Sequence, residues 1–463
     1  MMFAPRGLGN RWAMLIGGDL VCVVAAVYAA IALTDRPGFA IADTYGAGQV
    51  AATMAALHLG LIYYQDLYTI DRPRTDAWIA AATISATVKL ALVLGAIVMI
   101  VPALAVGRIF LGAYLTIAGA MLIGWRFAAN SIFFTRFNIG VMALGFSESA
   151  PALIEEIGRC GHLGYRFLGI ATFAGGGAEI AMPAGLARIA AARAARIADL
   201  SPRNGVNAIV VLDGVTEPAA VRAIVQCRVH GTAVFDFESF YERVAGKLPV
   251  QFIRDSWLVF APGFTGTQWR RTLKRVIDIA VAAAIAAVAW PIAIVTALAI
   301  KLESPGPVFY SQERVGLDGA VFRVLKFRSM RADAERATGA VWAQSNDPRV
   351  TRVGRIIRRA RIDELPQLYN VIRGDMSIVG PRPERPEIVA RLETEIPHYQ
   401  YRHLVRPGLT GWAQVCFPYG ATVEEAREKL CYDLYYIKNW SILFDLQIIL
   451  QTTKVVIFGR GSR

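Results

Sequence analysis

The chain has 463 residues, of which 55% are hydrophobic and 18% are charged. Its mean hydropathy is +0.41 and its formal net charge is +13 at pH 7. Soluble domains carry about 25% charged residues, so the composition excludes an ordinary soluble protein and indicates a membrane protein of two or three domains. The positive charge fits anionic lipid or a phosphate-bearing substrate, and the hydrophobicity argues against nucleic acid. The five cysteines form no CxxC pair, which fits a reducing compartment.

Residues 1–136 are predicted to form a four-helix transmembrane region. Its apolar runs are residues 12–33, 50–64, 78–101 and 109–134. Each approaches the ~20 residues that cross a ~30 Å hydrocarbon core. The arginines that flank these runs place both ends of the bundle in the cytoplasm by the positive-inside rule. Asp19, His58 and Lys89 lie within the runs, where we expect helix–helix contacts or snorkelling ends, with a transport path as the alternative.

Residues 137–250 are predicted to form a Rossmann-like α/β domain. Strands are expected at residues 141–146 and 208–212, and helices at residues 150–160 and 219–229. Alternating strands and helices favour a doubly wound parallel sheet. A nucleotide is a common ligand of such a sheet, but no GxGxxG follows the first strand. A nucleotide-sugar dehydratase or epimerase built on this domain is therefore an alternative that lacks its glycine fingerprint.

A connector at residues 251–270 leads to a fifth apolar run at residues 276–300. Basic residues flank it on both sides: Arg270, Arg271, Lys274, Arg275, Lys301, Arg314, Arg323 and Lys326. Both flanks are therefore expected in the cytoplasm. Pro291 lies near the middle of the run, and a proline removes a backbone hydrogen bond and bends a helix. We predict a re-entrant helix at residues 274–302 that enters the inner leaflet, turns at Trp290 and Pro291 and returns, with a plain fifth span as the alternative.

Two adjacent acids, Asp363 and Glu364, follow an arginine-dense segment. Its arginines are Arg349, Arg352, Arg355, Arg358, Arg359 and Arg361. A nearby opposite charge lowers the pKa of a carboxyl by about 1–3, so both acids are expected to be ionised and available as a nucleophile or a metal ligand. Guanidinium groups bind phosphate oxygens with paired hydrogen bonds, and this combination suits phosphoryl chemistry on a magnesium-bound diphosphate. A basic amphipathic helix with i,i+4 charge pairs is the alternative interpretation.

Several short motifs follow the fifth apolar run in order. They are Ser304-Pro305-Gly306-Pro307-Val308, Gln312-Glu313-Arg314-Val315-Gly316, Lys326-Phe327-Arg328-Ser329-Met330, Asp363-Glu364, Gly380-Pro381-Arg382-Pro383 and Arg406-Pro407-Gly408-Leu409-Thr410-Gly411-Trp412-Ala413-Gln414. With these motifs, the chain from about residue 270 onward resembles the bacterial sugar transferases that make polyprenyl-phosphate-linked sugars, the monotopic phosphoglycosyl transferases. The whole layout resembles the large members that begin exopolysaccharide or O-antigen synthesis.

The resemblance implies a reaction in two steps. Asp363 would attack the β-phosphorus of a UDP-sugar and release UMP, and undecaprenyl phosphate would then take the phosphosugar from the enzyme. Glu364 would assist by holding Mg²⁺, with Asp363 as the other metal ligand, or by handling a proton. The residues expected to bind substrate are Arg358, Arg382, Lys326 and Arg328. For Lys326 and Arg328, pairing with a structural acid is the alternative, and Pro291 matches the proline that breaks the family's re-entrant helix.

The chain departs from the family pattern at three places. Trp290 stands where many members have Ser, Arg361-Ile362 precedes the acid pair where Ser-Leu is common, and Cys416 occupies a place often held by Asn. None of these departures changes the acid pair. The last two bear on substrate preference.

The expected fold is therefore a membrane α/β protein with a four-helix transmembrane bundle, a Rossmann-like α/β domain and a mostly helical catalytic domain at residues 271–463. The last two are expected on the cytoplasmic side of the bacterial inner membrane, because the donor is a soluble anion and the acceptor is a phosphate on a long lipid. The sequence leaves open the sugar, a homodimer and any ligand of the middle domain. A catalytically silent membrane scaffold or nucleotide-sensing assembly protein is the alternative function.

Overall fold

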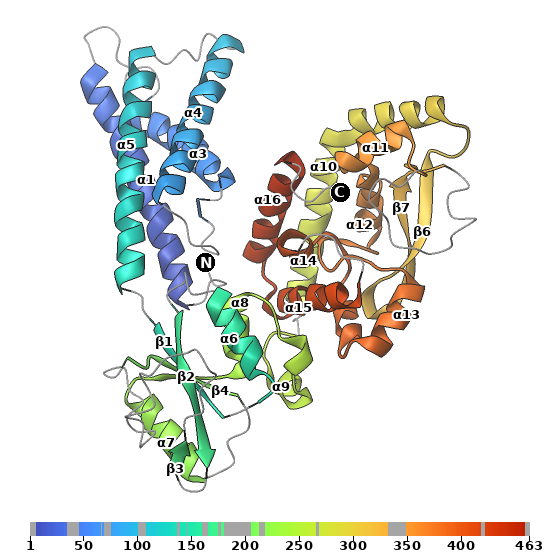
Figure 1. The fold of residues 1–463 in the computed structure, drawn as a ribbon. Coiled ribbons are helices and arrows are strands. Elements are labelled where there is room, and N and C mark those ends of the chain that lie inside the picture. Colours follow the sequence, from blue (N-terminus) through green and yellow to red (C-terminus); the bar gives the residue numbers. More distant parts are fainter. Residues whose placement is uncertain are drawn as a thin grey trace. The chain divides into compact units, whose positions relative to one another are not determined.

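The computed structural model describes most of the chain. The described residues are 6–34, 46–65, 67–68, 76–100, 108–136, 139–145, 147–159, 165–174, 177–179, 205–212, 218–264, 268–331, 349–417 and 422–458. The chain divides into two compact units, Met1–Val244 and Ala245–Arg463 (Figure 1). The first unit contains a helical bundle and a parallel sheet, and the second contains all of the motifs named above.

In the described part of the bundle there are four helices: α1 (Arg6–Thr34), α3 (Ala47–Tyr64), α4 (Asp76–Ile100) and α5 (Arg108–Arg136). Helix α1 packs closely on α5, and a Cβ at Gly18 would lie only 2.0 Å from Cε2 of Trp125. Among the described residues, four helices are long and apolar enough to cross a membrane, namely α1, α4, α5 and α10 (Gln268–Glu303). The predicted span at residues 50–64 is not among them, because α3 has 18 residues that include Gln49 and His58.

Two buried ionisable residues of the bundle make contacts between helices. Asp19 of α1 forms a buried ion pair with Arg126 of α5. The Nδ1 atom of His58 in α3 lies 3.0 Å from the hydroxyl oxygen of Tyr114 in α5. Lys89 lies exposed on α4. The expectation of helix–helix contacts is thus confirmed for Asp19 and His58, whereas Arg126 is a partner that the sequence did not single out.

The sheet of the first unit has five strands in the order β3-β2-β1-β4-β5. The elements are β1 (Ile139–Leu144), α6 (Ala150–Arg159), β2 (Tyr165–Ala174), β3 (Gly177–Glu179), β4 (Ala208–Val211), α7 (Pro218–Val229), β5 (Ala233–Asp236) and α8 (Phe237–Ala245). Strands β2, β1, β4 and β5 are parallel, and β3 is antiparallel to β2. The predicted alternation and parallel pairing are confirmed, because β1 and β4 are buried apolar strands as a parallel sheet requires. The Rossmann-like classification stays a prediction.

The second unit is mostly helical, with two small two-stranded sheets. Its elements are η5 (Val250–Phe252), α9 (Asp255–Phe260), α10 (Gln268–Glu303), β6 (Phe309–Val315), η6 (Leu317–Gly319), β7 (Val321–Phe327), α11 (Arg352–Arg359), η7 (Ile362–Glu364), α12 (Gln367–Arg373), β8 (Ser377–Val379), α13 (Pro386–Glu395), η8 (Tyr399–Leu404), β9 (Gly408–Thr410), α14 (Trp412–Cys416), α15 (Val423–Asn439) and α16 (Ile442–Phe458). Strands β6 and β7 form an antiparallel hairpin, and β8 pairs with β9 in parallel. The carboxyl ends of strands β7 and β8 lead into the candidate site.

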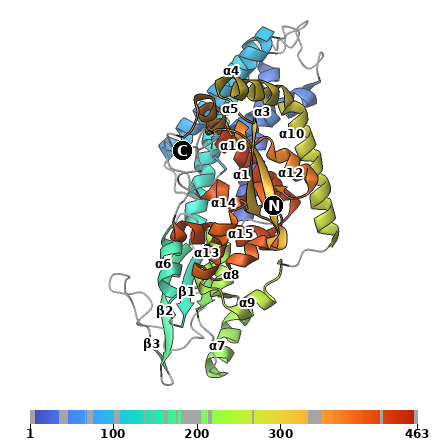
Figure 2. The ribbon, with the colours of Figure 1, turned by 90° about the vertical axis from the view of Figure 1, so that its right-hand side faces the viewer.

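Helix α10 is bent. It has 36 residues with Pro291 inside, and two views show two arms that meet at a bend (Figures 1 and 2). In the arm before Pro291, Asp278 accepts hydrogen bonds from the hydroxyl of Ser377 (2.8 Å) and the amide of Ile378 (3.2 Å). In the arm after Pro291, Ile300 packs in a small core with β7 and α11. Both arms are therefore held against the same unit.

Candidate active site

The acid pair lies in η7, a short turn that follows α11. Thr351 caps the start of α11 by accepting a hydrogen bond from the amide of Gly354 (2.9 Å). At Arg361, just after the helix, the backbone is left-handed with φ 59°. That conformation costs a non-glycine residue of order 1–3 kcal/mol, so the surrounding contacts must hold the turn. The turn buries Asp363 and Glu364, each 8% exposed.

Glu364 is held by two cations from different elements. Its Oε1 atom accepts hydrogen bonds from Nζ of Lys326 on β7 (3.0 Å) and from Nη2 of Arg382 after β8 (2.8 Å). Burial opposes ionisation of this carboxyl, but the charges of Arg382 and Lys326 outweigh it and hold the pKa of Glu364 well below its usual value. The lowered pKa agrees in direction with the prediction of an ionised acid at Glu364.

Asp363 behaves in the opposite way. Burial and the neighbouring charge of Glu364 raise its pKa above the ordinary aspartate value, and they outweigh Lys326 and Arg358. The arginines lower the pKa of Asp363 as expected, but the expectation that its net pKa falls below the ordinary aspartate value is wrong. Its Oδ1 atom is buried and accepts no hydrogen bond from the described part of the chain. Such a carboxylate is basic and poorly solvated, and perturbed groups of this kind occur often at functional sites.

The other residues predicted to bind substrate lie in different settings. Arg358, near the end of α11, lies close enough to Asp363 for its charge to oppose the rise in pKa. Arg328 donates hydrogen bonds to the carbonyl oxygens of Pro305 (2.7 Å) and Ser304 (2.9 Å), so its guanidinium fixes the turn after α10. A Cβ at Gly306 in that turn would lie 2.3 Å from Nη1 of Arg328. Substrate contacts by Arg358 and Arg328 stay predictions.

Two further arginines reach the loop that carries Arg382, and the sequence analysis gave neither a role. Nη1 of Arg314 donates to the carbonyl oxygen of Pro383 (3.0 Å), and Nη2 of Arg402 donates to that of Arg382 (3.0 Å). Arg314 lies within one of the short motifs, which was a usable signal. Arg402 lies outside them, and no local pattern in the sequence marks it.

The acid pair has oxygens that fit a magnesium ion. The described residues contain no group of three or more His, Cys, Asp or Glu that could hold a metal by itself. Mg²⁺ commonly binds through one or two carboxylates and completes its shell with water and substrate phosphates. Asp363 has a buried oxygen without a hydrogen bond, and Glu364 lies next to it in the chain. The pair therefore suits an ion shared with a diphosphate.

The apolar helices and the buried acid pair beside two cations fit a membrane-associated transferase. Residues 269–459 match the model of the family described as Bacterial sugar transferase. Over 181 residues the chain is 50% identical to a UDP-glucose:undecaprenyl-phosphate glucose-1-phosphate transferase of Caulobacter vibrioides. This alignment covers 39% of the present chain and 67% of the Caulobacter protein. Over 185 residues it is 44% identical to an exopolysaccharide production protein of Rhizobium leguminosarum, with coverage of 39% and 92%. The chain belongs to the bacterial sugar transferase family.

A longer alignment is with a relative whose name gives a different sugar. Over 242 residues it is 41% identical to a UDP-N-acetylgalactosamine-undecaprenyl-phosphate N-acetylgalactosaminephosphotransferase of Aeromonas hydrophila. That alignment covers 52% of this chain and spans 56% of the length of the Aeromonas protein. The names of the relatives therefore include both glucose and an N-acetylated hexosamine.

Proposed function

We propose that this protein transfers a sugar 1-phosphate from a UDP-sugar to undecaprenyl phosphate and releases UMP, as the first membrane step of exopolysaccharide or O-antigen synthesis. The names of the relatives support the two substrates. The observation that carries the proposal is the buried acid pair, in which Asp363 has a raised pKa and an oxygen without a hydrogen bond, while Glu364 binds two cations.

In the first step, a carboxylate oxygen of Asp363 forms a bond to the β-phosphorus of the UDP-sugar. The bond from that phosphorus to the bridging oxygen breaks, and its electron pair leaves with UMP. In the second step, a phosphate oxygen of undecaprenyl phosphate bonds to the same phosphorus, and the bond to Asp363 breaks. The carboxylate is restored, so one difficult transfer becomes two easier ones.

The cations around Glu364 are already in place before substrate binds. Lys326 and Arg382 share one carboxylate oxygen, so their positive charge need not reorganise when negative charge develops on the phosphate oxygens. Arg358 lies near Asp363 and would bind the diphosphate. Mg²⁺ held between the acid pair and the diphosphate would neutralise further charge on the phosphate oxygens.

The form of α10 supports a helix that enters one leaflet and returns. No residue between Ala282 and Thr296 is buried, and Ile285, Val288, Trp290 and Val295 are exposed there. About thirteen helical residues rise only ~20 Å, which is short of the ~30 Å hydrocarbon core. Contacts of both arms with the same unit support a helix that returns to the side from which it started. This side is the cytoplasm, where the UDP-sugar is.

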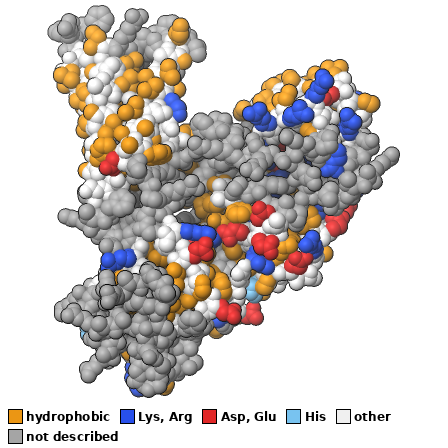
Figure 3. All heavy atoms as spheres, in the orientation of Figure 1, with side chains coloured by type: hydrophobic (Ala, Val, Ile, Leu, Met, Phe, Trp, Pro, Cys, Tyr) orange, Lys and Arg blue, Asp and Glu red, His pale blue; other side chains and the backbone are white. Residues whose placement is uncertain are grey.

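The surface beside α10 fits the headgroup region of the inner membrane. Ile356 of α11 is 67% exposed, and the neighbouring Arg355 and Arg359 are exposed as well. Figure 3 shows Lys and Arg side chains among hydrophobic ones on the part of this unit that α10 and α11 form. Apolar side chains with interspersed cations bind membranes through burial and attraction to anionic lipid.

A panel of UDP-sugars incubated with purified protein and radiolabelled polyprenyl phosphate tests the proposal. One UDP-sugar should give UMP and a labelled lipid-linked product in equal amounts. A silent scaffold gives neither product with any sugar. Asp363→Asn serves as the matched control, because it keeps the size and shape of the side chain and removes the nucleophile.

A further inference from the structure

We propose that Arg402 and Arg314 are positioning residues that clamp the loop carrying Arg382 by its backbone carbonyl oxygens and thereby hold the Arg382 guanidinium on Glu364. Neither arginine contacts the acid pair in the described structure. Their effect on transfer rests on the proposed function, whereas their effect on the loop does not.

The loop at residues 380–384 is suited to such a clamp because two of its residues are prolines. Pro381 and Pro383 have no backbone N–H, so the loop can be fixed mainly through its carbonyl groups. Each carbonyl oxygen from residue 381 to residue 384 accepts a hydrogen bond from another element: Pro381 from the amide of Gly408 (2.8 Å), Arg382 from Arg402 (3.0 Å), Pro383 from Arg314 (3.0 Å) and Glu384 from the amide of Val315 (3.0 Å). Two of these four donors are arginine side chains.

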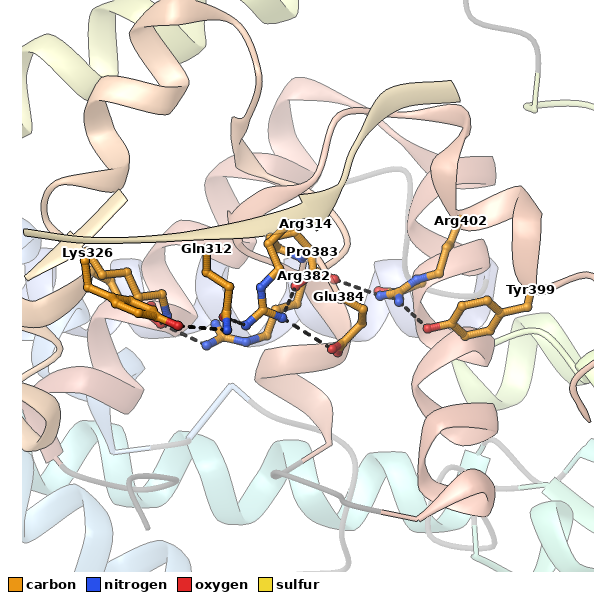
Figure 4. A network of polar contacts seen from close by, with 11 residues as sticks. Gln312, Arg314, Lys326, Arg382, Pro383, Glu384, Tyr399 and Arg402 are labelled. Carbon is orange, nitrogen blue, oxygen red and sulfur yellow. Dashed lines mark hydrogen bonds and ion pairs between the residues drawn. The ribbon is translucent and has the colours of Figure 1, made fainter. Parts of the chain in front are cut away.

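Arg402 is itself held firmly. It is 6% exposed, and its Nη2 atom also donates to Oδ2 of Asp433 on α15 (2.9 Å). Its Nη1 atom donates to the hydroxyl of Tyr399 (Figure 4). A buried ion pair gains little net stability over apolar side chains of the same volume. A role in fixing the position of the loop explains a buried arginine here better than a role in stability does.

Arg314 reaches the same loop from strand β6. Its Nη2 atom donates to Oε1 of Gln312 (2.6 Å), and Nε2 of Gln312 donates to the hydroxyl of Tyr310 (3.1 Å). Figure 4 shows the two guanidinium groups of the clamp, with Arg314 next to Pro383 and Arg402 next to Tyr399. Adjacent carbonyl groups of one loop are thus fixed from two different elements, β6 and η8.

The clamp matters because Arg382 acts at the end of a flexible side chain. Its Nη2 atom is 2.8 Å from Glu364, and that distance depends on where the loop places its Cα. A misplacement of ~1 Å caused by a change away from the reacting atoms can lower a rate by about 100-fold. Because the clamp acts only through Arg382, loosening one carbonyl contact is expected to lower kcat by about 3- to 10-fold, less than the loss of Arg382 itself, with little change in KM.

The test compares wild type with Arg402→Lys. A lysine keeps a positive charge opposite Asp433, but its single nitrogen cannot bind Tyr399, Asp433 and the loop carbonyl in the same geometry. We expect faster hydrogen exchange in the peptide covering residues 376–388 and a kcat for UMP release that is about 3- to 10-fold lower. The double variant Arg382→Lys with Arg402→Lys should be no slower than Arg382→Lys alone, because both changes act through one guanidinium.

Lys247→Met is the matched control. It removes another buried cation of the same unit, which pairs with Glu428 of α15 at 2.7 Å. Exchange in peptide 376–388 should stay as in wild type, and kcat should change less than twofold.

The clamp is refuted if Arg402→Lys has the hydrogen exchange and the kcat of wild type. It is also refuted if kcat in the double variant falls by the full product of the two single-variant effects. If Arg402→Lys does not yield folded protein, Arg314→Lys tests the same loop from β6 with the same expected results. If wild type releases UMP from no UDP-sugar, the proposed function fails, while the exchange comparison still decides the clamp.

Discussion

Replacing Arg382 by methionine removes one of the two cations that bind Glu364. The lost contact is a charge-assisted hydrogen bond of 2.8 Å, and such bonds contribute about 1.5–3 kcal/mol. Lys326 still donates to the same oxygen at 3.0 Å, so Glu364 keeps a counter-charge and the lower part of that range applies. A loss of about 1.5–2 kcal/mol corresponds to about 10- to 30-fold in kcat/KM, since each 1.36 kcal/mol is tenfold.

The assay is UMP release at several UDP-sugar concentrations, with thermal unfolding measured in parallel. Arg373→Met is the control, because Arg373 is an exposed arginine of the same unit that pairs with the half-buried Asp375 at 2.7 Å, and an ion pair with a solvated partner contributes little. It should change kcat/KM less than twofold. Adding Lys326→Met to Arg382→Met leaves Glu364 buried without either cation, and we expect a clear loss of stability. Equal effects of Arg382→Met and Arg373→Met would refute the role assigned to Arg382.

Four further outcomes are expected. Asp363→Asn should abolish both transfer and the covalent phosphosugar adduct seen by mass spectrometry, while membrane insertion persists; turnover at the wild-type rate contradicts the nucleophile. The pKa of Asp363 is raised above 3.8, and the form that attacks is the carboxylate. We therefore expect kcat/KM to fall with decreasing pH at a pH above the pKa of an ordinary aspartate. If kcat/KM falls only at or below pH 3.8, Asp363 is not the nucleophile. Arg358→Ala should raise KM for the UDP-sugar by about 10-fold or more, since a charge-assisted bond contributes about 1.5–3 kcal/mol; an unchanged KM places Arg358 away from the diphosphate. A cysteine at the exposed position of Arg323, in a cysteine-free background, should react with a membrane-impermeant thiol reagent only from the cytoplasmic side, and labelling from the periplasm refutes the re-entrant helix.

Elements with strong local patterns were predictable from the sequence. The strand observed as β4 and the helices observed as α6 and α7 begin and end within one residue of their predicted bounds, because buried apolar strands alternate there with amphipathic helices. The meeting of Glu364 with Lys326 and Arg382 joins three motifs that the sequence already marked. Such features depend on residue types and order, which a sequence contains.

Features that depend on tertiary contacts were not predictable in this way. Arg402 and Asp433 are far apart in the chain, and their pairing appears only when η8 and α15 pack together. Arg126 is similar, because an arginine within an apolar helix finds Asp19 only across the bundle. Burial was also missing from the sequence argument about the acid pair, which counted the arginines near Asp363 but not the loss of water around it.

The opposite pKa shifts of two adjacent acids fit the different roles proposed for them. In sequence, Asp363 and Glu364 share the same neighbouring charges, so charge counting treats them alike. The short turn η7 aims one carboxylate at Lys326 and Arg382 and leaves an oxygen of the other buried without a donor. Where the environments of two acids move their pKa values apart, the two acids can take different tasks. Glu364, held as an anion by two cations, is suited to organise charge, and Asp363, with the more basic carboxylate, is suited to attack phosphorus.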